Sequence, residues 1–238
     1  MNATVVLVHG AMHTPWIFGP LRERLSARGI PSRAVQLPSS NPDSAATRGL
    51  AEDVATVRAE IDSVDGPVVL AAHSYGGVPA TWAAVDAGQV TELVYIAAFA
   101  LEPGVSMMKW MGGDFPPTWI HSPDGLAVKA SDARESIFSG VDPQLTDEAV
   151  ERLNWQGTGA FTETLGAAPA RLPLTYVVAT EDPALPPAVQ EEWAARAAHS
   201  FRVPSGHSPH LSHPDQVAAV LAEAVGRSAD ATWHPGRR

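Results

Sequence analysis

Ser74 is the residue whose sequence setting points most directly to chemistry. It ends a short apolar run and precedes two glycines, Gly76 and Gly77, and then a helix-forming segment at 78–87. A strand, a sharp turn and a helix in this order form a nucleophile elbow, in which a strained backbone presents the serine hydroxyl at the strand's end. Small residues two positions either side of the serine, here Ala72 and Gly76, let strand and helix approach closely. A serine that merely caps a helix would not need both glycines, so we interpret Ser74 as a nucleophile.

A serine nucleophile needs a base to accept its proton and an acid to orient that base. In a parallel sheet these partners follow later strands, in the order serine, acid, histidine. Asp182 comes just after a predicted strand at 174–179, and His207 lies in the loop after a short strand at 201–203. We therefore predict that Ser74, His207 and Asp182 act together.

Glu181 and Glu102 are alternative candidates for the acid. Glu181 directly precedes Asp182, and Glu102 follows the predicted fourth strand. Asp182 is favoured because the Asp-Pro pair starts a turn and releases the side chain from the strand.

His210 and His213 are alternative candidates for the base. His207 is favoured because it follows Gly206 at the start of its loop, whereas His213 sits at the entry to the next helix. The three-residue spacing of these histidines also suggests a metal site. Two prolines break any helix that would align them and no carboxylate motif accompanies them, so we predict no metal.

An oxyanion hole requires two backbone N–H groups that point at the developing negative charge. Tyr75 supplies the first, at a helix N-terminus next to the nucleophile. The loop after the first strand supplies the second, with Ala11 as the favoured donor and Gly10 allowing the tight bend. His9 and His13 are interpreted as loop anchors, and His13 also as a candidate pocket residue.

The predicted elements alternate between strands and helices, which indicates a mostly parallel six-stranded sheet with helices on both faces. The strands are predicted at 4–8, 32–37, 68–72, 93–98, 174–179 and 201–203, and the helices at 15–28, 45–64, 78–87, 188–198 and 214–225.

Residues 102–171 interrupt this alternation after the fourth strand. They have no strand pattern and many aromatic and methionine residues, which favours a helical cap over the active site. We expect some of these side chains to line a substrate pocket, and select Trp110, Trp119 and Trp155. The α/β core then comprises 1–101 and 172–227, and the polar segment 228–238 is expected to be a flexible tail.

Composition excludes several classes of protein. The 16 basic and 26 acidic residues give a formal net charge of −10, which disfavours nucleic acid and anionic membranes as partners. There is no cysteine, so disulfides and thiolate chemistry are absent. The N-terminus lacks a signal-peptide pattern and no segment is long and apolar enough to span a membrane, so we expect a cytoplasmic protein without a cofactor.

The chain resembles the α/β-hydrolase superfamily, and within it the small bacterial esterases related to plant methylester esterases and hydroxynitrile lyases. The resemblance runs from residue 3 to about 226 and rests on His9-Gly-Ala-Met-His13, Ala72-His-Ser-Tyr-Gly-Gly77, Thr180-Glu-Asp182 and Gly206-His-Ser-Pro209. It implies a triad of Ser74, His207 and Asp182.

Two positions favour hydrolysis over cyanohydrin cleavage. The lyases that this chain resembles typically carry Thr where Gly10 stands and Lys where Ser208 stands. We therefore expect a serine hydrolase, monomeric or homodimeric, that cleaves a carboxylic ester or lactone of a small to medium hydrophobic substrate through an acyl-enzyme on Ser74. The alternatives are a cofactor-free lyase or cyclase acting on a natural-product intermediate, and a weakly hydrolytic ligand receptor.

Overall fold

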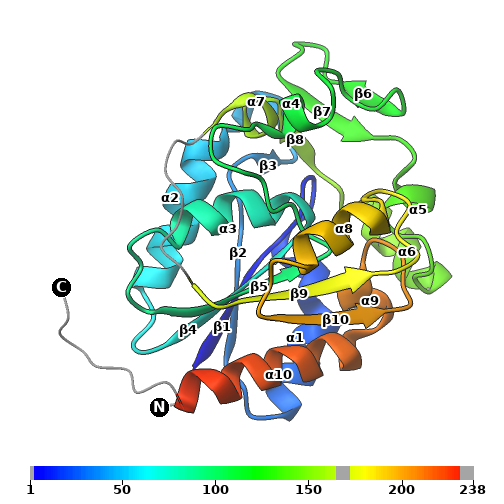
Figure 1. Cartoon of the computed structure of the whole chain (residues 1–238). Coiled ribbons are helices and arrows are strands. Elements are labelled where there is room, and N and C mark those ends of the chain that lie inside the picture. The colour runs from blue at the N-terminus through cyan, green and yellow to red at the C-terminus, as the bar shows by residue number, and fades with distance from the viewer. Residues whose placement is uncertain (1–2, 165–171, 231–238) are drawn as a thin grey trace.

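Six parallel strands form the main sheet, as predicted. The computed structural model describes residues 3–164 and 172–230. The strands are β1 (Thr4–Val8), β2 (Ser32–Val35), β4 (Val68–His73), β5 (Val90–Ile96), β9 (Leu174–Ala179) and β10 (His199–Val203). Their order across the sheet is β2-β1-β4-β5-β9-β10 (Figure 1). Val8 pairs with Ala72 and His73 with Ile96, so the carboxyl ends of the three strands β1, β4 and β5 meet at one edge.

Helices cover both faces of this sheet. Helices α1 (Gly19–Ala27) and α10 (Pro214–Asp230) pack together on one face, and α2 (Leu50–Asp62), α3 (Gly77–Ala83) and α8 (Pro187–Ala194) lie on the other (Figure 1). Every residue of β4 is buried, which explains why this strand is a continuous apolar run rather than an alternating one. Within the described residues, no helix has the length and apolar character needed to cross a membrane.

Two predicted helices begin later than expected. The first splits into a 3-10 turn at Pro15–Phe18 and then α1, because Pro20 has no N–H with which to continue the helical ladder. The second begins at Leu50 rather than at residue 45. The side chain of Glu52 accepts a hydrogen bond from the backbone N–H of Gly49 at 3.2 Å and thereby marks the helix start.

The prediction that the cap has no strands is wrong. Its helices are α4 (Met107–Trp110), α5 (Ala133–Ser136), α6 (Pro143–Glu151) and α7 (Gly159–Thr162), and its strands are β6 (Trp119–His121), β7 (Ala127–Ala130) and β8 (Trp155–Gly157). These strands form an antiparallel sheet of order β3-β8-β7-β6, in which β3 (Ser40–Asn41) comes from the core. The cap is therefore joined to the core by strand pairing. The segment 165–171 lies outside the described residues.

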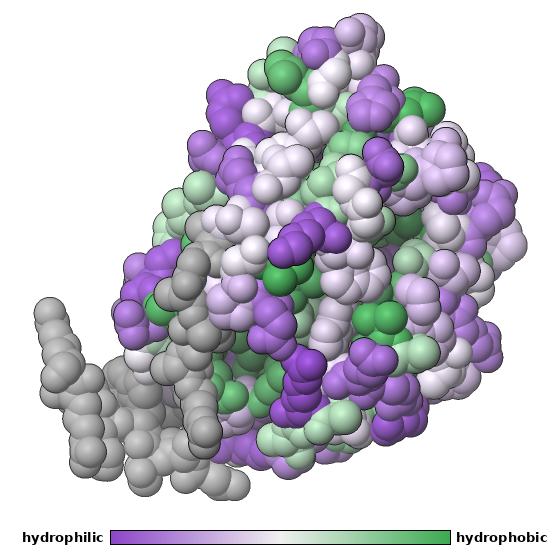
Figure 2. Space-filling view, turned by 45° about the horizontal axis from the view of Figure 1, so that its top comes forward, coloured by the Kyte–Doolittle hydropathy of each residue, from purple (hydrophilic) through white to green (hydrophobic). Residues whose placement is uncertain are grey.

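Large apolar side chains that remain exposed among the described residues belong to the cap: Trp110, Ile120 and Leu126. On the face shown in Figure 2, hydrophobic residues form scattered patches between hydrophilic ones. Most aromatic side chains of the cap are thus at least partly buried, against the core or in the cavity described below.

The C-terminal helix is longer than predicted. Helix α10 continues through Asp230, three residues into the segment expected to be a tail. Ser228 is buried and its hydroxyl lies 2.6 Å from the hydroxyl of Thr91, while Arg227 pairs with Glu92 at 2.7 Å. These contacts hold the last turns of the helix against β5. The rest of the predicted tail, 231–238, lies outside the described residues.

Candidate active site

The turn after β4 has the strained geometry expected of a nucleophile elbow. Ser74 has a φ of 52°, in the left-handed region that side chains rarely adopt. A Cβ atom at Gly76 would lie 2.5 Å from the carbonyl oxygen of His9 and 2.6 Å from that of Val8. At Gly77 a Cβ would lie 2.4 Å from the carbonyl oxygen of Phe99. Both glycines are needed because the turn packs directly against neighbouring backbone.

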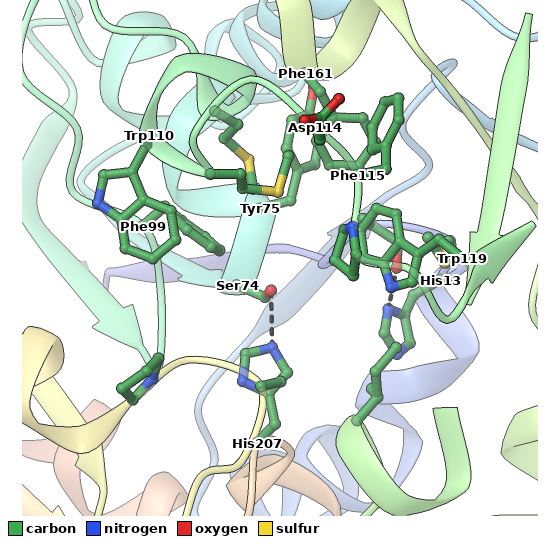
Figure 3. Close-up of a pocket in the computed structure, with 18 of the residues that line it drawn as sticks. His13, Ser74, Tyr75, Phe99, Trp110, Asp114, Phe115, Trp119, Phe161 and His207 are labelled. Carbon is green, nitrogen blue, oxygen red and sulfur yellow. Dashed lines mark hydrogen bonds between the residues drawn. The ribbon is translucent and has the colours of Figure 1, made fainter. Parts of the chain in front are cut away.

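Ser74, His207 and Asp182 form one hydrogen-bonded chain. The Ser74 Oγ lies 2.8 Å from Nε2 of His207, and Nδ1 of the same ring lies 2.7 Å from Oδ2 of Asp182 (Figure 3 shows the serine and histidine). In this arrangement the serine donates to the imidazole, and the imidazole donates to the carboxylate. All three residues are at least nine-tenths buried, so solvent does not compete with these bonds.

Asp182 is held in place by further donors. Its Oδ1 accepts from the backbone N–H groups of Ala184 at 2.8 Å and Leu185 at 2.9 Å, and its Oδ2 accepts from Nε2 of Gln190 at 2.8 Å. Gln190 is fully buried on α8, and its Oε1 accepts from the backbone N–H of Ala179 at 2.9 Å. Sequence reasoning missed Gln190, because a glutamine on a short helix is ordinarily read as a surface residue.

The alternative acids and the second rival base lie elsewhere. Glu181 is exposed, and Glu102 is exposed and pairs with Arg196. His213 lies at the start of α10, where its Nδ1 is 2.9 Å from the Ser212 hydroxyl. The structure therefore brings only Asp182 of the candidate acids to His207.

Four further histidines, including the other alternative base His210, are buried: His9, His13, His73 and His210. Nε2 of His73 lies 2.8 Å from the carbonyl oxygen of His207, and its ring centroid is 4.3 Å from that of His210. His9 anchors the loop after β1, with Nδ1 2.8 Å from the Gly10 carbonyl oxygen and Nε2 accepting from the Leu37 N–H at 3.1 Å.

Burial keeps these four rings uncharged. It lowers the pKa of His9 to about 4 and that of His13 to about 3. Burial also holds the pKa of His73 and of His210 well below the usual range, and neighbouring histidines add to the effect. The described residues contain no group of three acidic or histidine side chains arranged to hold a metal ion.

A cavity of about 490 Å³ opens above Ser74 and His207. Ala11 and Tyr75, the predicted oxyanion-hole residues, line it together with His13, Trp110 and Trp119. The structure places Trp155 outside the cavity, on β8, where it pairs with Asn41 of β3. Its selection as a pocket residue is wrong, because the strand pairing of β8 directs this part of the cap toward the core.

Two aromatic groups flank Ser74 in this cavity (Figure 3). On one side the rings of Phe99 and Trp110 meet edge to face with centroids 5.0 Å apart. On the other, Phe115 and Trp119 are stacked at 5.9 Å, and Phe161 packs 5.5 Å from each. Both sides of the serine hydroxyl are therefore apolar surfaces that can receive hydrophobic groups.

Comparison with known proteins identifies the family. The model of the alpha/beta hydrolase family matches residues 5–220, and the chain belongs to this family. It is 27% identical over 252 residues to the alpha/beta hydrolase nvfD of Aspergillus novofumigatus, covering 97% of this chain and 99% of that protein. The predicted superfamily is therefore confirmed, and the chain is an enzyme of the hydrolase class.

Solved structures show the same fold at low identity. A pyrethroid hydrolase has a TM-score of 0.82 at 22% identity, covering 97% of this chain and 100% of that one. A methylesterase from Arabidopsis has a TM-score of 0.81 at 21% identity, covering 94% of this chain and 99% of that one. The overall fold is thus common to hydrolases of diverged sequence.

Proposed function

We propose that this chain is a carboxylic ester hydrolase that forms an acyl-enzyme on Ser74. His207 acts as the general base and acid, and Asp182 orients it. The observation that carries the proposal is the hydrogen-bonded chain from Ser74 through His207 to Asp182, which ends at the floor of an apolar cavity. The esterases among the structural neighbours support the same reading.

The proposed reaction has two halves. Nε2 of His207 takes the proton of Ser74 as the serine oxygen attacks the acyl carbon, and the backbone N–H groups of Ala11 and Tyr75 stabilise the oxyanion. His207 then gives its proton to the departing alcohol, which leaves an acyl-enzyme. In the second half His207 takes a proton from water, the hydroxide attacks the acyl carbon, and Ser74 recovers its proton as the carboxylic acid product forms.

The cavity favours a small to medium hydrophobic ester or lactone. A volume of about 490 Å³ falls in the range of pockets that hold drug-sized ligands. Aromatic surfaces lie on both sides of Ser74, so the acyl group and the alcohol group can each be apolar. Asp114 lines the same cavity, and its negative charge favours a neutral substrate over an anionic one.

Hydrolysis of p-nitrophenyl esters of increasing acyl length tests the proposal. We expect multiple turnover by the wild-type protein, a transient acyl adduct on Ser74 detectable by mass spectrometry, and loss of both in Ser74→Ala. Ser228→Ala is the matched control, because it removes an equally buried hydroxyl that contacts Thr91, at the opposite edge of the sheet.

A folded wild-type protein without turnover on any ester or lactone would refute the proposal. Ligand binding without turnover would then favour a receptor. Cleavage or cyclisation of a substrate without an acyl adduct would favour a lyase or cyclase.

A further inference from the structure

Asp53 is a buried carboxylate that the proposed reaction does not use. It lies in the first turn of α2, is fully buried, and makes no ion pair with a cationic side chain within the described residues. Its Oδ1 accepts from the backbone N–H of Ser39 at 2.9 Å, and its Oδ2 accepts from the Ser39 hydroxyl at 2.5 Å and the Tyr75 hydroxyl at 2.6 Å. Burial raises the pKa of Asp53 to about 6, despite these three donors. Burial of a carboxylate without a cationic partner costs folding free energy, so we expect Asp53 to have a role in the site.

The hydrogen bonds continue from Asp53 into the cap. The Ser39 hydroxyl accepts from Nε2 of Gln156 at 2.6 Å, and Oε1 of Gln156 accepts from the backbone N–H of Met12 at 2.8 Å. Gln156 is fully buried on β8. Each donor in this hydrogen-bonded series has one acceptor. The direction of the Ser39 hydroxyl hydrogen and the orientation of the Gln156 amide are therefore both determined.

This series of hydrogen bonds connects the two segments that form the proposed oxyanion hole. At one end, Tyr75 follows the nucleophile, and its backbone N–H is one proposed donor. At the other end, Met12 follows Ala11, whose N–H is the second proposed donor.

Met12 is held in a strained conformation. Its φ is 68° although it is not a glycine, and it is fully buried. Its carbonyl oxygen accepts from the N–H of Asn154 at 2.8 Å, and its sulfur accepts from the N–H of Ala130 at 3.2 Å. The cap therefore holds this loop at several points, and Gln156 is the point that connects it to Asp53.

We infer that Asp53, Ser39 and Gln156 are positioning residues that fix the two oxyanion-hole N–H groups relative to each other. The inference rests on the proposed function. A fixed distance between the two donors is what oxyanion stabilisation requires, because the donors must already point at the charge when it develops. A displacement of well under 1 Å at either segment is expected to reduce the rate without a change in substrate binding.

Asp53→Asn tests this with little change in shape. The amide nitrogen of the new asparagine would face the hydroxyls of Ser39 and Tyr75, which now donate to Oδ2. Because this nitrogen can only donate, the directions of these hydrogen bonds must reverse. We expect kcat to fall about tenfold to a hundredfold while KM stays within about threefold. Tyr75→Phe, which removes only one donor to Asp53 and keeps the backbone, is expected to lower kcat in the same sense.

Glu92→Gln is the matched control. Glu92 is also a nearly fully buried carboxylate and accepts from the Thr175 hydroxyl at 2.5 Å, but it lies near the start of β5, at the opposite edge of the sheet from Ser74. The Glu92→Gln substitution is expected to lower the melting temperature and to leave kcat unchanged. If Asp53→Asn and Glu92→Gln have the same kinetic profile, or if kcat is unchanged in Asp53→Asn, the inference is wrong. If Asp53→Asn does not fold, Tyr75→Phe decides by the same criterion.

A second measurement does not depend on activity. Hydrogen exchange of the Met12 amide, followed by NMR, is expected to be at least about tenfold faster in Asp53→Asn than in Glu92→Gln, because the acceptor Gln156 loses its orientation. If the wild-type protein hydrolyses no ester, the proposed function fails, yet this exchange still shows whether Asp53 holds the loop. Equal exchange in the two variants would refute the inference even if the enzyme is an active esterase.

Discussion

Acidification to pH 5 is expected to destabilise this protein, because four of its histidines are buried and uncharged: His9, His13, His73 and His210. In the unfolded chain each ring has a pKa near the ordinary histidine value of 6.5. Burial lowers the folded-state pKa of His9 to about 4, that of His13 to about 3, and those of His73 and His210 to well below the usual range. Below pH 6.5 the unfolded state therefore binds more protons than the folded state. By linkage, the free energy of unfolding must fall as the pH falls through this range.

The size of the effect follows from these pKa values. At pH 5 an unfolded ring is almost fully protonated, whereas the rings of His9 and His13 are almost fully neutral in the folded state, which costs about 2 kcal/mol for each and about 4 kcal/mol for the two. The lowered pKa values of His73 and His210 change the stability in the same direction. Asp53 acts in the opposite direction. Its folded-state pKa of about 6 exceeds the ordinary aspartate value of 3.8, so its protonation favours the folded state by about 1 kcal/mol at pH 5. The net loss from His9, His13 and Asp53 is about 3 kcal/mol, to which His73 and His210 add, and this is a large fraction of the stability of a typical domain.

Urea denaturation at pH 7.5, 6.0 and 5.0 measures this loss. His210→Leu is the informative variant, because within the described residues neither ring nitrogen of His210 has a hydrogen-bond partner, so none is left unsatisfied. His210→Leu is expected to reduce the pH dependence of the free energy of unfolding by at most one proton, which is at most about 1.4 kcal/mol per pH unit near pH 5. His199→Asn, at an exposed position on β10, serves as the control. A free energy of unfolding that is constant from pH 7.5 to 5.0, or an unchanged slope in His210→Leu, would refute the reasoning.

Two substitutions near the nucleophile give further tests. Gly76→Ala places a Cβ 2.5 Å from the carbonyl oxygen of His9, so we expect a stability loss of about 3 kcal/mol and a kcat at least about a hundredfold lower, measured by urea denaturation and ester turnover. Gly88→Ala is its control, since a Cβ there meets no atom within 4 Å, and equal effects in the two would contradict the explanation. Gln190→Glu replaces the amide donor to Asp182 with a second carboxylate, so we expect kcat to fall about tenfold or more and stability by about 3 kcal/mol. A kcat within twofold of wild type would show that this hydrogen bond has no influence on the reaction.

The parts of the site that could be predicted from sequence are those encoded locally or by strand order. The elbow at Ser74 is contained in a few consecutive residues, whose glycines meet backbone that any fold of this type must bring close. Asp182 and His207 follow strands whose carboxyl ends lie at the same edge of a parallel sheet, so their approach to Ser74 needs no detailed knowledge of packing.

The parts that could not be predicted depend on long-range polar contacts and on very short strands. Gln156 lies 117 positions from Ser39, and its amide has no periodic pattern that would reveal the contact. The cap strands β6 and β8 have three residues each, too few for alternation to be seen. The place of Trp155 outside the cavity cannot be predicted for the same reason, because it depends on the pairing of β8 with β3.

The cap contains two kinds of residue near the site: those that line the cavity and those that hydrogen-bond to the loop after β1. Phe115 and Trp119 line the cavity, so their replacement changes the shape offered to a substrate. Gln156 and Asn154 instead hydrogen-bond to Met12, next to the proposed oxyanion donor Ala11. Substitutions of the first kind should alter KM among esters of different size, whereas substitutions of the second kind should lower kcat for all of them. Under the proposed function, substrate selection therefore depends on β6 and the segment before it, and transition-state stabilisation on β8 and the residue before it. The first can then change without loss of the second.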